Sequence, residues 1–340
     1  YSIITMFYVF LSISSGDEKL KIFILAGQSN MVGHADAHTI ATLFNSGSER
    51  DEMLAKLVFK EDSGLSKKVL EQQLSRAKKI DVLTGGISND KIKNLPEGDE
   101  KKALEEKVKK HKVGHDDYLA KVTSSCVVSD RVYINSIADG NVRSGKLGVG
   151  YGGGKNKLGP EYGFGLSIAE KIKGPILIIK TSWGGKSINY DFRPPSVGAY
   201  QLNEKQKADA KADQIRKNAS LNYRMMNEAI ANVLANLKDN HPDYNPNIGH
   251  EMAGFVWFQG FNDQFSPEFR DNYKKNMIAF IKDIRKEYMT PEMPFVIGVL
   301  GTGRTAEKVG KNKVSLGQRE AARAPEFKGN VLAVESYKDY

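Results

Sequence analysis

The sequence predicts an α/β/α sandwich, a parallel sheet of about five strands between two layers of helices. Its short apolar runs are continuous rather than alternating, as expected for strands buried on both faces of a parallel sheet. Between these runs lie longer helical patterns with Pro or Gly near their ends, and such alternation favours a doubly wound sheet. The predicted strands are 21–27, 175–182, 253–260, 294–301 and 331–336, and the predicted helices are 162–172, 203–240, 269–289 and 315–327.

The region from about 45 to 154 interrupts this rhythm, and we interpret it as a large helical insertion rather than a second domain. It contains a Lys/Glu-rich segment with a helical pattern at 100–112, and it has few long apolar runs from which to build a core of its own. A further strand is predicted within it, at 131–137. Residues 20–340 are then expected to form a single domain that carries this insertion.

The composition permits a normal globular core, because 40% of the 340 residues are hydrophobic and 27% are charged. The net charge of +9 favours an anionic partner, although a solvated Lys-rich face explains it as well. The single cysteine, Cys126, excludes an intramolecular disulfide. Residues 1–13 are apolar and too short to span a bilayer, so we interpret 1–15 as a partial signal peptide, with a buried strand or helix as the alternative. We expect a protein that is secreted, extracellular or periplasmic.

Polar and glycine-rich segments follow the predicted strands at their carboxyl ends. In an open parallel sheet, ligands bind outside these ends. The recurrence of such segments at one edge predicts a single site there. They read Gly27-Gln28-Ser29-Asn30-Met31, Ser182-Trp183-Gly184-Gly185-Lys186-Ser187, Gln259-Gly260-Phe261-Asn262-Asp263 and Gly301-Thr302-Gly303-Arg304.

Three of these segments resemble a known family. GQSNM after the first strand, GG after the second and QGxxD after the third look like the sialate O-acetylesterase and acetylxylan-esterase group (carbohydrate esterase family six) of the SGNH hydrolases. The resemblance covers roughly 21–330, with the middle region poorly matched. It implies a flavodoxin-like sheet and a secreted serine esterase that removes small acyl groups, expected to be acetyl, from a carbohydrate.

The resemblance assigns roles that suit the residue types. Ser29 would be the nucleophile, which needs a base to take its proton. The backbone N–H groups of Ser29 and Gly185 and the amide of Asn262 would hold the oxyanion, with Gln259 as a second candidate donor. Further candidate site residues are Gln28, Asn30, Gly184, Asp263 and His34. No cofactor or metal is expected. The partner would be an acetylated glycan rather than nucleic acid, with xylan, sialic acid and algal polysaccharides all open and the basic charge favouring an acidic one.

The chain also departs from the family pattern. Many relatives have His and Glu around the third block, where this chain has Phe258 and Phe261, so the role of that carboxylate is lost here. Gly159-Pro160-Glu161 resembles the family's GPE segment and is expected to open a helix near the site. We assign Glu161 no catalytic role.

Alternatives remain for these motifs. Ser29 could be an ordinary helix N-cap, and Asn262-Asp263 a capping pair before the helix that follows. A phosphate-binding loop is disfavoured, because Lys180 stands where the first glycine of GxxxxGK[ST] belongs before Lys186-Ser187. The rival function is a carbohydrate-binding protein that kept the fold and lost catalysis.

The catalytic base is not found in the sequence. In SGNH enzymes it is a histidine after the final strand, often in a DxxH block, and here no histidine follows His250. We therefore expect a parent protein that continues with a histidine-bearing helix, and a 340-residue chain that is nearly inactive. On a regular helix His34 and His38 would point away from Ser29, and His111 and His115 lie in the charged region. If the chain holds its own base, His34 is the first candidate.

Overall fold

The computed structural model describes residues 18–44, 47–65, 89–302 and 305–336. The predicted partial signal peptide, 1–15, lies outside these residues. The chain divides into two compact units, one of residues 1–32, 130–147 and 168–340, the other of 33–129 and 148–167. Residues 130–147 fall within the predicted insertion, but they belong to the first unit. The organisation of the chain as a single domain that carries an insertion remains a prediction. In the part of the chain described, no helix is both long and apolar enough to cross a membrane.

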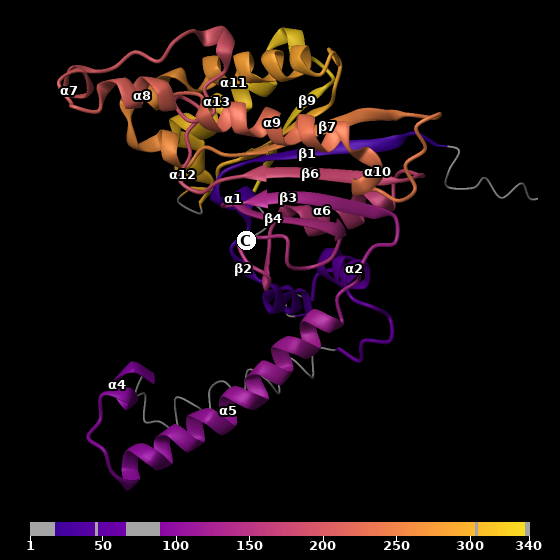
Figure 1. Ribbon diagram of the computed structural model, residues 1–340, viewed down its shortest axis with the longest axis vertical. Coiled ribbons are helices and arrows are strands. Elements are labelled where there is room, and N and C mark those ends of the chain that lie inside the picture. Colours follow the sequence, from indigo (N-terminus) through magenta and orange to yellow (C-terminus); the bar gives the residue numbers. More distant parts are fainter. Residues whose placement is uncertain (1–17, 45–46, 66–88, 303–304, 337–340) are drawn as a thin grey trace, which may run out of the picture. The chain divides into compact units, whose positions relative to one another are not determined.

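The first unit contains a seven-stranded sheet in the order β4-β3-β6-β1-β7-β8-β9 (Figure 1). All neighbouring strands are parallel except β3 and β4, which form an antiparallel hairpin at one edge. The predicted α/β fold with a parallel sheet is confirmed. The strands are β1 (Leu20–Gly27), β3 (Val132–Ala138), β4 (Asn141–Lys146), β6 (Ile176–Ser182), β7 (His250–Phe258), β8 (Phe295–Val299) and β9 (Val331–Glu335).

The helices of the first unit follow the strands in the expected alternation. They are α1 (Ser29–Val32), η3 (Pro195–Val197), α7 (Glu204–Lys207), α8 (Ala212–Asn218), α9 (Leu221–Ala235), α10 (Leu237–Asn240), η4 (Asn262–Phe265), α11 (Pro267–Glu287), α12 (Ala306–Lys311), α13 (Lys313–Ala322) and η5 (Pro325–Phe327). The sequence predicted one helical stretch over 203–240, whereas the structure has four helices there. Ser220 adopts a left-handed φ of 61° between α8 and α9. Asn236 has a non-helical backbone conformation and separates α9 from α10.

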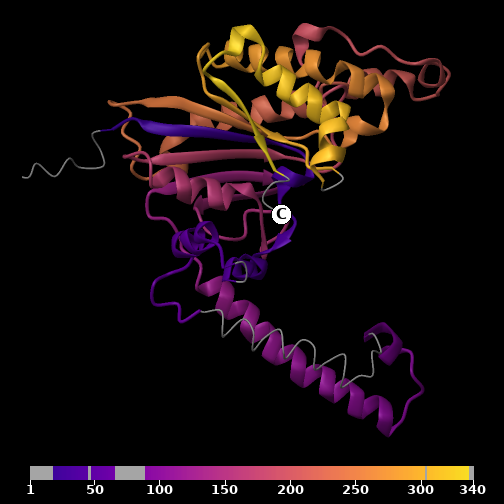
Figure 2. The ribbon, with the colours of Figure 1, turned by 180° about the vertical axis from the view of Figure 1, so that it is seen from behind.

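The core of the first unit lies between the sheet and its helices. Ile22 and Ile24 of β1 share one buried cluster with Met226 of α9 and Phe280 of α11. Leu25 alternates onto the opposite face and is equally buried, so both faces of the sheet are covered. Helix α13 packs beside α11 (Figure 2). This burial on two faces explains why the strands read as continuous apolar runs.

The second unit contains mostly helices. Its elements are β2 (Ala35–Asp36), η2 (Ala37–Phe44), α2 (Glu49–Val58), α4 (Asn89–Lys93), α5 (Asp99–Ser124), β5 (Lys157–Leu158) and α6 (Pro160–Ala169), whose last two residues belong to the first unit. The Lys/Glu-rich segment 100–112 lies within the long helix α5 (Figure 2). The Tyr162 hydroxyl of α6 lies 3.0 and 2.8 Å from the carbonyl oxygens of Val58 and Val127 and shares its one hydrogen between them, which connects three segments of this unit.

The register of the sheet brings the predicted site segments to one level. Gly27 at the end of β1 pairs with Ser182 of β6 and with Phe258 of β7, and Ala138 of β3 pairs with Ser182. The loops that follow these strands therefore leave the sheet together at its carboxyl edge.

Candidate active site

Ser29 lies at the carboxyl end of β1, where the chain turns directly into the short helix α1. Gly27 before it has φ 157°, and a Cβ there would stand 2.2 Å from the carbonyl oxygen of Phe258, so only glycine fits. Met31 and Val32 anchor α1 by their burial. The Ser29 side chain is half-buried, and within the described part of the chain its hydroxyl makes no hydrogen bond. It is thus presented at the sheet edge by a fixed turn.

Gln28 connects this turn to the loop after β7. Its side chain is buried, and its Oε1 accepts from the Gly260 N–H at 3.1 Å and from Gln259 Nε2 at 3.2 Å. Its Nε2 donates to Asn262 Oδ1 at 3.3 Å. A residue next to the predicted nucleophile therefore orients the predicted oxyanion donor.

Asn262 also reaches the loop after β6. Its Nδ2 donates to the Gly185 carbonyl at 2.8 Å, which uses one of its two amide hydrogens. With Oδ1 held by Gln28, the NH₂ group is fixed on the Gly185 side, and its second hydrogen stays available to a ligand. Gly185 has φ 70°, in the left-handed region that favours glycine. The structure brings Ser29, Gly185 and Asn262 to the same edge through these contacts.

Asp263 lies beneath this edge and is 0% exposed. It accepts hydrogen bonds from the N–H groups of Ile188 and Asn189, both at 3.1 Å, and from Gln259 Nε2 at 2.6 Å. Burial raises the pKa of its carboxyl to about 7, although these hydrogen bonds act in the opposite direction. Asp263 therefore ties the β6 loop to the β7 loop and does not face a ligand.

Gln259 is likewise turned into the protein, with 2% of it exposed. Besides Gln28 and Asp263, its Nε2 contacts the Lys186 carbonyl at 2.8 Å, and its Oε1 accepts from the Tyr273 hydroxyl at 3.2 Å. Its amide hydrogens are thus fully engaged, which favours a positioning role over donation to an oxyanion.

Three of the predicted neighbours have different surroundings. Gly184 donates its N–H to Asp139 Oδ1 at 2.6 Å. Asn30 is exposed on α1. His34 is exposed and belongs to the second unit.

The histidines of the first unit are far from this edge. His250 opens β7 and pairs in register with Leu20 at the amino end of β1, so the strand separates it from the candidate site by about 26 Å. His241 is fully buried between the Arg131 carbonyl, 3.2 Å from its Nε2, and the Asp243 N–H, 3.2 Å from its Nδ1. Burial lowers the pKa of His241. Neither can reach a substrate at the carboxyl edge.

Sequence reasoning missed Asp139, which reaches the site from the β3–β4 hairpin. Asp139 and Gly140 have φ of 49° and 80°, as in a type I′ turn. The Asp-Gly pair was a visible hairpin signal. That its carboxylate would accept from Gly184 was not visible, because β4 was not predicted.

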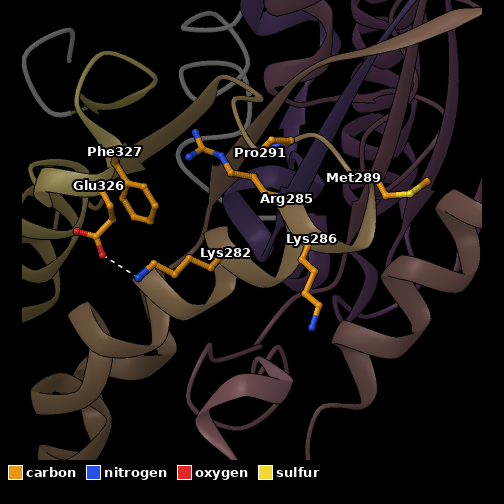
Figure 3. A pocket seen from close by; sticks show the side chains of 7 residues that line it. All are labelled: Lys282, Arg285, Lys286, Met289, Pro291, Glu326 and Phe327. Carbon is orange, nitrogen blue, oxygen red and sulfur yellow. Dashed lines mark ion pairs between the residues drawn. The ribbon is translucent and has the colours of Figure 1, made fainter.

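A pocket of about 380 Å³ lies at the other end of the sheet, around the end of α11 and the approach to β8. Figure 3 shows its lining, in which Lys282 pairs with Glu326 at 2.8 Å. Arg285 beside them donates hydrogen bonds to the Met293 carbonyl, at 2.8 Å, and to Asn330 Oδ1. None of the predicted site residues lines this pocket, so it is separate from the candidate active site.

Residues 146–336 match the model of a family described as carbohydrate esterase, sialic acid-specific acetylesterase. Among solved structures, a protein from Arabidopsis thaliana is 15% identical over 93% of this chain and 85% of its own, with a TM-score of 0.45. XAC1771, a carbohydrate acetylesterase from Xanthomonas citri, is 13% identical over 93% of this chain and 49% of its own, with a TM-score of 0.43. NanS is 13% identical over 62% of this chain and 69% of its own, with a TM-score of 0.36. No curated protein matches the chain.

Proposed function

Because the chain belongs to the carbohydrate esterase family of sialic acid-specific acetylesterases, we propose that it hydrolyses O-acetyl esters on a carbohydrate through an acyl-enzyme on Ser29. The family match includes Gly185 and Asn262 and begins after Ser29. The observation that carries the proposal is the bond from Asn262 Nδ2 to the Gly185 carbonyl, beside the turn that presents Ser29.

The proposed reaction has two steps. The Ser29 oxygen attacks the acetyl carbonyl carbon while a base takes the hydroxyl proton. The negative oxygen of the tetrahedral intermediate is held by the N–H groups of Ser29 and Gly185 and by the remaining Nδ2 hydrogen of Asn262. The intermediate collapses, the ester C–O bond breaks, and the sugar oxygen leaves with the proton returned by the base. In the second step the base takes a proton from water, whose oxygen attacks the acetyl carbon. The bond from the Ser29 oxygen to this carbon breaks, the serine oxygen recovers the proton from the base, and acetate is released.

A histidine base would have to come from outside the described residues of the first unit, since His241 and His250 lie at the opposite edge. The position of these two histidines also supports the second candidate function, a carbohydrate-binding protein without catalysis. Secretion is also proposed, on the apolar run at 1–13.

Acetate release separates the two candidates. The full-length protein should liberate acetate from acetylated xylan, measured enzymatically, at a rate above that of its Ser29→Ala variant. If the migration of the protein is retarded in a gel that contains the glycan but no acetate is released, the esterase proposal is wrong and the binding protein is favoured.

A further inference from the structure

Two exposed aromatic rings lie directly beside the predicted oxyanion donor. Phe261 precedes Asn262 in the chain and is 44% exposed, and Phe265, at the end of η4, is 68% exposed. Their ring centroids are 5.1 Å apart with an interplanar angle of 77°, so they form an edge-to-face pair. The pair is therefore a defined aromatic surface rather than two independent side chains.

Among the phenylalanine, tyrosine and tryptophan residues whose exposure the structure describes, only Phe261 and Phe265 are exposed, and all the others are buried or half-buried. An exposed aromatic surface is unfavourable in water unless a ligand covers it. That both exposed rings fall in one five-residue segment at the candidate site indicates a function for them.

The segment has two distinct sides. Asn262 and Asp263 turn inward and are held by Gln28, Gly185 and the β6 loop. Phe261 and Phe265 turn outward, and the Ser266 side chain accepts from the Phe269 N–H at the start of α11, so the segment is fixed at its far end. The inward contacts thus hold the aromatic pair in place next to the proposed oxyanion site.

We propose that Phe261 and Phe265 form an aromatic platform for a pyranose ring of the substrate, adjacent to the acetyl ester that Ser29 attacks, in which one ring stacks on the sugar and the other supports it edge-on. This rests on the proposed function. A pyranose has an apolar C–H face that packs on an aromatic ring, while its hydroxyls stay hydrated at the rim. Phenylalanine has no hydrogen-bonding atom, so the platform selects the sugar by shape and apolar contact. Its substrate class is an acetylated pyranoside rather than an acyclic ester.

The test measures binding separately from catalysis. In a Ser29→Ala background, which prevents turnover, calorimetry gives the Kd for an acetylated xylo-oligosaccharide. Phe261→Ala and Phe265→Ala should each weaken binding by about tenfold, the effect of truncating a contact anchor. Phe265→Trp should retain binding and Phe265→Leu should weaken it about as much as Phe265→Ala, because the ring rather than apolarity alone is required. Leu332→Ala, on an exposed leucine of β9, is the matched control and should leave the Kd unchanged.

A second ligand tests the nature of the platform. Binding of hexyl acetate, an acyclic apolar ester, should be weakened much less by the two alanine variants than binding of the sugar. Equal weakening for both ligands would identify a general apolar site and overturn the proposal, as would sugar binding unaffected by either alanine variant. If the protein with Ser29 intact releases no acetate while sugar binding still depends on the pair, the proposed esterase function fails and the platform stands.

Discussion

Gln28 Nε2 donates to Asn262 Oδ1 across 3.3 Å, joining the residue before the proposed nucleophile to the proposed oxyanion donor. The two residues are 234 positions apart in the chain. This bond, with that from Asn262 to the Gly185 carbonyl, connects the loops after β1, β6 and β7. The predictions below test whether these contacts serve catalysis, stability or both.

Ser29→Ala should lower turnover of an aryl acetate by at least about ten-thousandfold, because removing a nucleophile leaves only the oxyanion donors. The measurement is hydrolysis by the full-length protein, together with labelling by a fluorophosphonate. Ser196→Ala, on an exposed serine of η3, is the control. Labelling that survives in the Ser29 variant would assign the nucleophile to another serine.

Asn262→Ala should lower turnover by about a hundredfold or more, the usual effect of losing one preorganised oxyanion donor. The thermal midpoint should fall little, since the Asn262 side chain is half-buried. Kinetics and thermal unfolding of the same preparation are compared. A large fall in the midpoint with turnover per folded molecule retained would make Asn262 a structural cap.

Gln28→Leu should reduce the free energy of unfolding by about 1–3 kcal/mol, because the buried Gly260 N–H and Gln259 amide would lose their acceptor. Turnover should fall as well, because Asn262 loses the bond that orients it. Urea unfolding and kinetics measure the two effects. Asn30→Ala, on the exposed neighbour, should change stability by less than about 0.5 kcal/mol. An equally small effect for Gln28→Leu would contradict this role.

The stability of the protein should depend on Asp263 between about pH 4 and pH 7. The pKa of Asp263 is raised from 3.8 to about 7 in the folded protein, so unfolding releases its proton in this range. Its contribution to stability is therefore complete below pH 3.8 and is lost as the pH rises to about 7, at up to about 1.4 kcal/mol per pH unit.

Asp263→Asn isolates this contribution. The variant should be less stable, because an NH₂ group would face the N–H of Ile188 or Asn189, and its deficit relative to wild type should shrink as the pH rises from 4.5 to 7. Urea unfolding across the range measures the deficit, with Asp239→Asn on an exposed helix position as the control. A deficit that does not change with pH would mean that Asp263 is ionised throughout.

His250→Ala should leave ester turnover within about twofold of wild type, because β7 places this residue about 26 Å from the site. His34→Ala in the same assay tests the histidine that the sequence offers first as a base. A large loss for His250→Ala with unchanged stability would show that the site is at the amino edge of the sheet.

The sequence by itself determined six of the seven strands, since apolar runs mark them as a local pattern, but not β4, which is polar and mostly exposed at the edge of the sheet. It also determined that the segments around Ser29, Gly185 and Asn262 share one edge, because parallel strands have their carboxyl ends together. The interpretation of 203–240 as a single helical stretch was wrong because the left-handed turn at Ser220 has no strong local signal.

The tertiary structure alone decided how the side chains at that edge are used. The inward orientation of the Gln28 and Gln259 side chains and the contact from Asp139 to Gly184 depend on residues that are 45 to 234 positions apart in the chain. The exposure of Phe261 depends on which residues pack around its ring. Such contacts follow from strand register, which includes a shift between Ile22 and Phe23 in the β1–β7 pairing. Local periodicity carries no information on register across distant strands, so these positions required the fold.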